Sequence, residues 1–267
     1  TGVHMPYASN GETRLYYEIE GKGPPMVLSH GFMMDTTSWY DLGYVAELKP
    51  AYTLLIMDAR GHGASDKPHD VPDYNDKTMA ADVLSVMSSA GVDSAHFFGF
   101  SMGGRTGLEL AVIAPDRFRS FIIASATPGA RTDVGKKSDI RRIEMFQEGP
   151  KAVAVAMDKL SPEMDPYRIQ AIEGDLEAYL AKTRSNIDRA DITSELSNLK
   201  VPCLMYAGES DPLSHDSALK AVREIPSARF ISLPGLKHMY TFGRTDIVFP
   251  IVRKFLEGIP QGQALIT

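Results

Sequence analysis

The chain has 267 residues, of which 43% are hydrophobic and 23% are charged. This composition suits a globular protein with one core, or one core with a modest insertion, and no apolar run approaches the roughly 20 residues of a membrane-spanning helix. The formal net charge of −6, with Lys and Arg scattered along the chain, argues against a nucleic-acid-binding face and against attraction to an acidic membrane surface.

Residues 1–4 precede the first methionine, Met5. They contain neither the basic segment nor the apolar stretch of a signal peptide, so they are predicted to be a remnant of cloning, and the protein is expected in the cytoplasm. The single cysteine, Cys203, lies in the apolar run 201–207. It can form no intramolecular disulfide and is predicted to be a buried thiol.

Short apolar segments rich in β-branched and aromatic residues alternate with longer segments whose apolar residues recur at helical spacing. This alternation is typical of a mainly parallel sheet with helices on both faces. Glycines around the first apolar segment predict an antiparallel hairpin at the edge of the sheet. The predicted strands span 15–20, 26–29, 53–57, 95–98, 120–124, 202–207 and 229–233, and the predicted helices span 79–90, 105–113, 216–224 and 246–256.

The alternation stops between residues 128 and 199, where the sequence becomes helical and charged and is interrupted by prolines and glycines. Apolar residues such as Val153 and Met157 recur there every three to four positions, which predicts amphipathic helices. About 70 residues without a convincing strand is long for one crossover connection. We therefore predict a helical cap over 128–199, inserted into a core domain of residues 5–127 and 200–267, with a run of ordinary crossover helices as the alternative.

The segment Gly99-Phe100-Ser101-Met102-Gly103-Gly104 follows a predicted buried strand and precedes a predicted helix. A serine at the apex of such a turn, beside small residues that let the backbone fold sharply, forms a nucleophile elbow. Ser101 is then at a helix N-terminus, where free backbone N–H groups favour developing negative charge. The alternative for Ser101 is an ordinary turn serine between glycines.

A serine hydroxyl is a weak nucleophile near neutral pH, so it requires a base, and the base requires a group that orients it. Asp211 and His238 each follow a predicted strand, in loops at the carboxyl ends where open α/β sheets build their sites. The order Ser101, Asp211, His238 is the one expected of hydrolases built on a nucleophile elbow. Glu209 and Asp116 are the alternatives to Asp211.

Two further segments complete a resemblance to the α/β-hydrolase family. Ser29-His30-Gly31-Phe32 resembles the oxyanion loop of that family, and residues 58–68 resemble a signature of its capped members. The resemblance covers nearly the whole chain apart from the cap and implies a mainly parallel eight-stranded sheet, helices on both faces and an inserted helical cap. It also implies a serine hydrolase with an acyl-enzyme intermediate, in which the backbone N–H groups of Phe32 and Met102 form the oxyanion hole.

Several other residues have two possible roles. Trp39 is predicted to be either a pocket wall or core, and His30 either holds loop backbone or touches substrate, whereas Arg60 and Asp66 are expected to tie a loop together. No cofactor is implied, and no cluster of His, Asp and Glu has the spacing of metal ligands. The residues predicted to line the substrate pocket are His30, Gly31, Trp39, Phe146, Met157 and Met239.

The sequence therefore predicts a hydrolase of a small-to-medium carboxylic ester or lactone, resembling carboxylesterases and 3-oxoadipate enol-lactone hydrolases. Serine as nucleophile argues against dehalogenases and epoxide hydrolases of this fold, which use a carboxylate there. Carbon–carbon bond hydrolases, perhydrolases and lyases use nearly the same residues, and a ligand-binding module with little turnover can retain them. A small molecule is the predicted partner, without nucleic acid or membrane, and the oligomeric state is left open.

Overall fold

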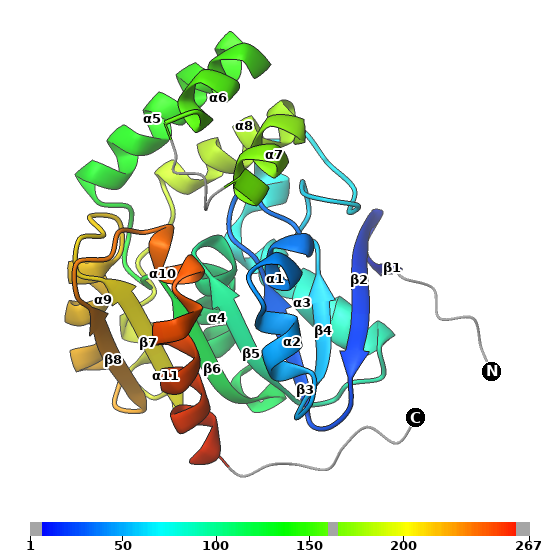
Figure 1. Ribbon diagram of the computed structural model, residues 1–267, viewed down its shortest axis with the longest axis vertical. Coiled ribbons are helices and arrows are strands. Elements are labelled where there is room, and N and C mark those ends of the chain that lie inside the picture. Colours follow the sequence, from blue (N-terminus) through cyan, green and yellow to red (C-terminus); the bar gives the residue numbers. More distant parts are fainter. Residues whose placement is uncertain (1–6, 160–164, 260–267) are drawn as a thin grey trace.

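The computed structural model describes residues 7–159 and 165–259. Within them, eight strands form one sheet in the order β1-β2-β4-β3-β5-β6-β7-β8, between layers of helices (Figure 1). β2 pairs antiparallel with β1 and β4, and all other neighbours are parallel. The strands are β1 (Tyr7–Asn10), β2 (Thr13–Gly21), β3 (Pro25–Ser29), β4 (Thr53–Met57), β5 (Ala95–Phe100), β6 (Phe118–Ala124), β7 (Cys203–Gly208) and β8 (Ala228–Leu233).

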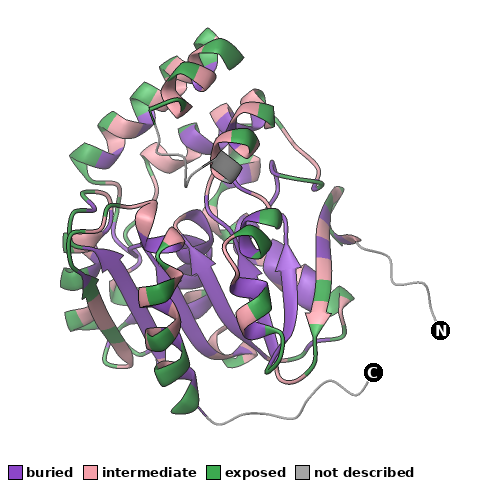
Figure 2. Cartoon of the chain, in the orientation of Figure 1, coloured by how far each residue is buried: buried purple, intermediate pink, exposed green. Residues whose placement is uncertain are grey.

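Helices pack on both faces of the sheet and each layer encloses its own apolar cluster. Because both faces are covered, β3, β4, β5 and β7 are buried along their whole length, and the sheet forms the purple centre of Figure 2. One face is covered by α3 (Asp76–Ser89), α4 (Met102–Ile113) and α9 (His215–Ala221), the other by α1 (Thr37–Asp41), α2 (Tyr44–Leu48), α10 (Tyr240–Gly243) and α11 (Thr245–Glu257). Short 3-10 helices occur at η1 (Val71–Tyr74), η2 (Pro115–Arg117), η4 (Ser194–Leu196) and η5 (Val222–Glu224).

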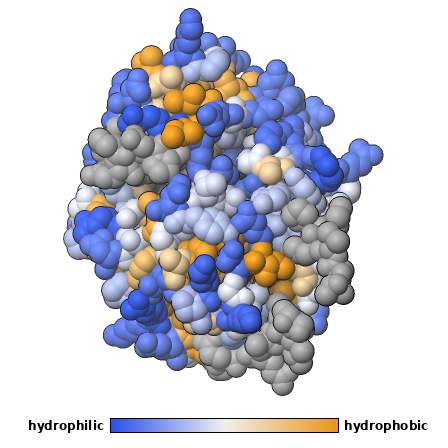
Figure 3. Space-filling view, turned by 45° about the vertical axis from the view of Figure 1, so that its right-hand side comes forward, coloured by the Kyte–Doolittle hydropathy of each residue, from blue (hydrophilic) through white to orange (hydrophobic). Residues whose placement is uncertain are grey.

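A helical segment separates β6 from β7 and lies above the sheet in Figure 1. It contains α5 (Asp133–Glu148), α6 (Pro150–Met157), α7 (Asp165–Glu173) and α8 (Leu176–Ile187). Its inner side chains form an apolar cluster that includes Phe146, Val153 and Tyr179 and reaches Phe32 of the sheet domain. Apolar groups are exposed at the top of the molecule in Figure 3, where this segment lies, and Ile140 and Val155 are among the exposed residues of its helices. The segment thus packs on the sheet domain through one side of its helices.

The predicted fold class is confirmed, including the antiparallel edge hairpin formed by β1 and β2. Each predicted strand is present, although β2 and β5 extend further than expected. The short helices α1 and α2 were not predicted, since five residues are too few to establish a helical period. No helix within the described ranges is both long and apolar enough to cross a membrane.

The strand register brings the candidate site residues to one edge of the sheet. Ser29 at the end of β3 lies beside Gly99 of β5, so the loop that begins at His30 is next to the turn at Ser101. Gly208 of β7 lies beside Leu233 of β8, so the two loops that follow these strands are also neighbours. All four loops leave from the carboxyl ends of parallel strands, which is where open α/β sheets hold their sites.

The loop after β4 is held by buried polar contacts. The guanidinium of Arg60 donates from Nε and Nη2 to the carboxylate of Asp82, at 2.6 Å each, and from Nη1 to the carbonyl oxygen of Asp73 at 2.9 Å. Asp66 accepts from the backbone and side chain of Arg14 on β2. Arg60 and Asp66 therefore tie this loop to its neighbours, as expected for structural charges.

Replacing Arg60 by methionine is expected to lower the free energy of unfolding by about 3–5 kcal/mol, because the carboxylate of Asp82 is then left buried without its cation. The side chains of this pair are only 3% and 2% exposed. Urea unfolding at pH 7 measures the change. Arg14→Met is the matched control, since the Arg14–Asp66 pair is at the surface and its loss should leave the urea midpoint nearly unchanged. Equal shifts in the two variants would contradict the prediction.

Candidate active site

Ser101 occupies a strained turn between β5 and α4. Its backbone has φ 50° and ψ −104°, a conformation that few residues with a side chain adopt. The turn is held because the backbone N–H of Ser101 donates to the carbonyl oxygen of Ala124 on β6, at 2.8 Å. Glycines are required on both sides, since a Cβ at Gly99 would lie 2.3 Å from the carbonyl oxygen of Gly103. This geometry presents the Ser101 hydroxyl at the edge of the sheet.

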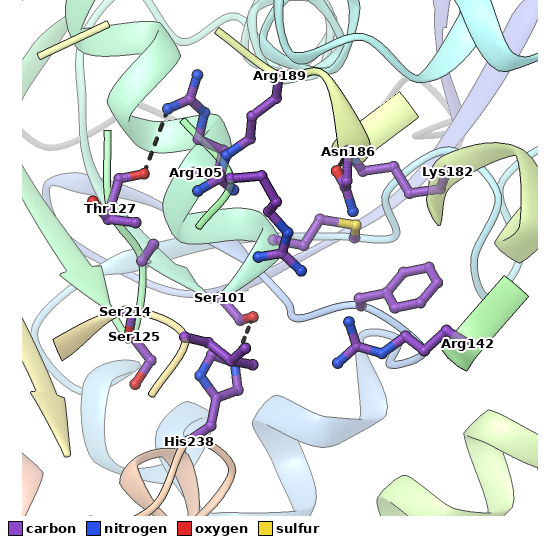
Figure 4. Close-up of a pocket in the computed structure, with 15 residues that line it drawn as sticks. Ser101, Arg105, Ser125, Thr127, Arg142, Lys182, Asn186, Arg189, Ser214 and His238 are labelled. Carbon is purple, nitrogen blue, oxygen red and sulfur yellow. Dashed lines mark hydrogen bonds between the residues drawn. The ribbon is translucent and has the colours of Figure 1, made fainter. Parts of the chain in front are cut away.

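A chain of hydrogen bonds runs from Ser101 to Asp211 through His238. Ser101 Oγ is 2.8 Å from His238 Nε2 (Figure 4), and His238 Nδ1 is 2.7 Å from Asp211 Oδ2. Because a carboxylate only accepts, Nδ1 carries the proton and Nε2 is left to accept from the serine hydroxyl. The imidazole is thus oriented to take a proton from Ser101. The ring of Phe100 packs against that of His238, with centroids 5.6 Å apart.

The carboxylate of Asp211 is buried and satisfied by neighbouring donors. Its Oδ1 accepts from the backbone N–H of Leu213 at 2.9 Å, and its Oδ2 also accepts from the hydroxyl of Ser214. Burial opposes ionisation, but the bonds from His238 and these donors outweigh it, so the pKa of Asp211 is lower than its usual value of 3.8. Asp211 therefore remains ionised near neutral pH, as a group that orients a histidine must.

Neither alternative to Asp211 lies against His238. Glu209 is exposed and accepts from the backbone N–H of Gly235, at 3.1 Å. Asp116 is exposed in η2, which follows the far end of α4 from Ser101. The structure thus brings Ser101, His238 and Asp211 together and leaves the other two carboxylates outside the relay.

Replacing Ser214 by alanine is expected to lower stability near pH 7, because the Asp211 carboxylate loses one of its hydrogen bonds. A carboxylate whose pKa is depressed in the folded state contributes stability above the usual pKa of 3.8, and that contribution is lost as the pH falls through the lower native value. The difference in unfolding free energy between wild type and variant should therefore be about 1.5–3 kcal/mol at pH 7 and should shrink toward pH 2–3. Urea titrations across this range measure it, and a difference independent of pH would contradict it.

The two residues predicted to form the oxyanion hole line the same cavity as Ser101. Phe32, in the loop after β3, and Met102, at the start of α4, both line the cavity beside Ser101. No acceptor within residues 7–159 or 165–259 takes either backbone N–H. Free N–H donors beside a nucleophile can stabilise an oxygen that becomes negative during the reaction.

His30 and His62 hold the loops that carry these donors. The Nε2 atom of His30 accepts from the backbone N–H of Ala59 at 3.0 Å, and Nε2 of His62 accepts from that of Met33 at 3.1 Å. Both rings are fully buried. Burial holds the pKa of His62 well below its usual value, so this ring is neutral and can accept. Of the two roles considered for His30, the structure shows the one of holding loop backbone.

The cavity beside Ser101 has a volume of about 70 Å³ and a basic lining (Figure 4). Arg105 of α4 enters it from the sheet domain, while Arg131, Arg142, Lys182 and Arg189 enter from the helical segment and its flanking loops. The remaining lining residues are Phe32, Ser101, Met102, Ser125, Ala126, Thr127, Asn186, Leu213, Ser214 and His238.

None of the six residues predicted to line the pocket is among the residues that line the cavity beside Ser101. Trp39 is fully buried in the core layer of α1 and α2, with its ring against Tyr44 and Phe242. His30 and Gly31 lie within the packed loop after β3, and the ring of Phe146 packs against that of Phe32. Met157 and Met239 pack against apolar clusters of the helical segment and of the core.

The basic lining and Ser214 were not predicted from the sequence. On α5 and α8 the cations alternate with apolar residues as they do on any solvated helix, so no local signal distinguishes them. Within the described residues, no group of three or more His, Cys, Asp and Glu side chains is arranged to hold a metal ion.

The comparisons with known proteins agree with this fold. A family model described as the alpha/beta hydrolase fold matches residues 24–153. The putative carbamate hydrolase RutD of Azorhizobium caulinodans is 29% identical over 270 residues, which cover 96% of this chain and 100% of that protein. 3-oxoadipate enol-lactonase 1 of Acinetobacter baylyi is 29% identical over 226 residues, or 79% of this chain and 82% of that protein.

Among solved structures, the enol-lactonase from Burkholderia xenovorans LB400 superimposes with a TM-score of 0.83 at 27% identity, covering 94% of this chain and 100% of that one. A thermophilic esterase from Thermogutta terrifontis, at 24% identity and a TM-score of 0.80, shares the fold over 94% of this chain and 96% of that one. The sheet order, the turn at Ser101 and these matches together identify the fold of this chain as the α/β-hydrolase fold.

Proposed function

We propose that the protein hydrolyses a small-to-medium carboxylic ester or lactone through an acyl-enzyme intermediate. The observation that carries this proposal is the continuous hydrogen-bonded relay from Ser101 through His238 to the ionised Asp211. Similarity to proteins named as enol-lactonases and as a carbamate hydrolase supports it, because those names describe hydrolysis at a carbonyl group.

In the first half of the reaction, Ser101 Oγ attacks the substrate carbonyl carbon while His238 Nε2 takes the hydroxyl proton. The Asp211 carboxylate stabilises the imidazolium that forms. The carbonyl oxygen becomes an oxyanion, which the N–H groups of Phe32 and Met102 bind, and a donor of this kind typically contributes about 3 kcal/mol to the transition state. The imidazolium then protonates the leaving alkoxide, so the alcohol departs and the acyl group remains on Ser101.

In the second half, His238 takes a proton from a water molecule that attacks the acyl carbon. The same donors bind the second oxyanion, and the imidazolium returns its proton to Ser101 Oγ as the acid leaves. For a lactone, the alcohol and the acid are the two ends of one product. The route requires no cofactor.

The helical segment acts as a cap in this proposal. Residues 128–199 are taken as the cap and residues 5–127 and 200–267 as the core, and the proposal is supported by Arg131, Arg142 and Arg189, which line the cavity beside Ser101. A cavity of about 70 Å³ holds only a handful of water-sized groups, which favours a short acyl chain.

Turnover of p-nitrophenyl esters from acetate to decanoate, with a panel of small lactones, tests the proposal. We expect sustained turnover with an optimum at short chains, and a mass increase on the Ser101 peptide equal to the acyl group when the reaction is quenched early. A single stoichiometric release of product would favour the ligand-binding module. Absence of turnover across the panel would contradict the ester hydrolase and favour a carbon–carbon bond hydrolase, perhydrolase or lyase.

A further inference from the structure

The cavity beside Ser101 holds more positive than negative side chains. Five cations line it, and in the described part of the chain they share the carboxylates of Asp76, Asp139 and Glu109. Asp76 pairs with both Arg105 and Lys182, at 2.8 and 3.7 Å. Burial of cations is costly unless each has an anionic partner, so the surplus of charge requires an explanation.

The five cations differ in how far their charges and donors are already paired. Arg105 is fully engaged, since it also donates to the carbonyl oxygens of Pro128 and Ala190 at the two ends of the helical segment. Arg189 differs: no carboxylate of the described residues forms an ion pair with it, and its Nε and Nη2 both donate to the carbonyl oxygen of Gly129, at 3.3 and 3.2 Å. Its Nη1 donors have no acceptor within the described ranges.

Arg142 and Asn186 supply further hydrogen-bond donors in the lining of the same cavity. Arg142 reaches Asp139 at 3.1 Å, but that carboxylate is already bound by two nitrogens of Arg131, at 2.6 and 2.7 Å. Asn186 Oδ1 accepts from Lys182 Nζ at 2.7 Å, which leaves the Asn186 N–H₂ group as a donor. In the view of Figure 4, Arg105, Lys182 and Arg189 lie on the opposite side of Ser101 from His238, and Arg142 extends toward the centre from the right.

The pKa values of Arg189 and Lys182 are consistent with an excess of positive charge around the cavity. Burial, with the charges of Arg105 and Arg131, lowers the pKa of Arg189 to about 9, and burial lowers that of Lys182 to about 8. A group whose cationic form is disfavoured by its neighbours is stabilised when an anion enters.

We propose that Arg189, with Arg142 and Asn186, forms a subsite for an ionised carboxylate, so that the substrate is an ester or lactone that carries a second, negatively charged carboxyl group. The inference rests on the proposed function and specifies its substrate class. A guanidinium N–H forms a strong, charge-assisted hydrogen bond to a carboxylate oxygen, and the Nη1 donors of Arg189 are free to form one. The carboxylate would hold the substrate at one end while the carbonyl at the other end meets Ser101.

Two esters of matched shape test the subsite. Monoethyl succinate carries a terminal carboxylate, and ethyl 4-oxopentanoate has a neutral acetyl group in its place. Their hydrolysis by the full chain can be followed by titration of the released acid. We expect kcat/KM to be at least about tenfold higher for the anionic ester, and Arg189→Gln to lower this ratio by about tenfold or more, chiefly through KM.

Control variants separate substrate binding from general damage to the fold. The Arg142 side chain is partly exposed, and Arg142→Gln should also lower the ratio of kcat/KM between the anionic and the neutral ester. Arg253→Gln, which removes a surface cation paired with Glu47, should leave the ratio unchanged. Urea unfolding confirms that each variant is folded. A ratio near one in wild type, or Arg189 and Arg142 variants that lose both esters in proportion, would overturn the subsite.

Failure of the proposed function gives a different result. If neither ester shows turnover that depends on Ser101, the hydrolase proposal fails, and binding of succinate itself then decides the subsite. Calorimetric titration should show succinate binding that Arg189→Gln weakens by about tenfold or more. Absence of succinate binding, or equal binding by both proteins, would overturn the inference.

Discussion

Replacing Ser101 by alanine is expected to lower kcat/KM for a short p-nitrophenyl ester by about 10⁴-fold or more, the largest effect of any single substitution. Alanine removes Oγ, and with it the atom that forms the acyl bond and donates to His238 Nε2. The remaining N–H donors of Phe32 and Met102 can still bind a carbonyl oxygen, so a small residual rate is expected. Substrate binding itself should change little.

Steady-state kinetics with active-site titration measure this loss. Ser88→Ala on α3 is the matched control, since Ser88 is exposed and lies outside the cavity. It should retain the wild-type rate, and both variants should unfold at similar urea concentrations. Retention of activity within tenfold in the Ser101 variant would show that another nucleophile performs the reaction.

Replacing Gly103 by alanine is expected to lower the free energy of unfolding by about 3 kcal/mol or more, or to prevent folding. A Cβ at this position would lie 2.1 Å from the backbone carbonyl oxygen of Ser29 and 2.6 Å from its carbonyl carbon. Ser29 cannot move aside easily, because its strand is paired with neighbours on both sides. The close approach also positions the turn at Ser101 against the loop after β3, since the Gly103 N–H donates to the carbonyl oxygen of His30 at 3.0 Å.

Urea unfolding again gives the measurement. Gly243→Ala is the matched control, since nothing lies within 4 Å of a Cβ added there, in helix α10. It should change stability by less than about 1 kcal/mol. A Gly103 variant as stable as this control would mean that the approach of α4 to β3 is looser than the structure shows. A folded Gly103 variant should also lose activity, since its elbow is displaced from the loop of Phe32.

Most of the sheet could be predicted because its signals are local. Buried parallel strands are short apolar runs, and the helices between them repeat apolar residues at a helical period, so windows of ten to fifteen residues suffice. The turn at Ser101 has an equally local signal, since the neighbouring chain comes so close to Gly99 and Gly103 that neither position has room for a Cβ. By contrast, α1 and α2 are too short to show a period.

The pocket could not be predicted in the same way. An apolar side chain has the same periodicity whether it faces a cavity or another side chain, so Trp39 and Phe146 were as compatible with a pocket wall as with the core. The charged side chains of α5 and α8 raise the opposite problem, because a cation on a helix is normally solvated. Lys182 is nevertheless only 3% exposed in the folded chain, since α8 packs against η1 and the start of α3.

The amino-acid sequence by itself determined the fold class, the position of the turn at Ser101 and the order of the three relay residues, since strand patterns, glycine positions and loop positions are read along the chain. Tertiary structure alone decided which side chains share the cavity. Arg105 and Arg189 are 84 positions apart and meet only because the helical segment between β6 and β7 returns to the sheet edge beside α4. Positions along the chain do not indicate that these two side chains line the same cavity, so the positive charge of the cavity is known only once the chain is packed.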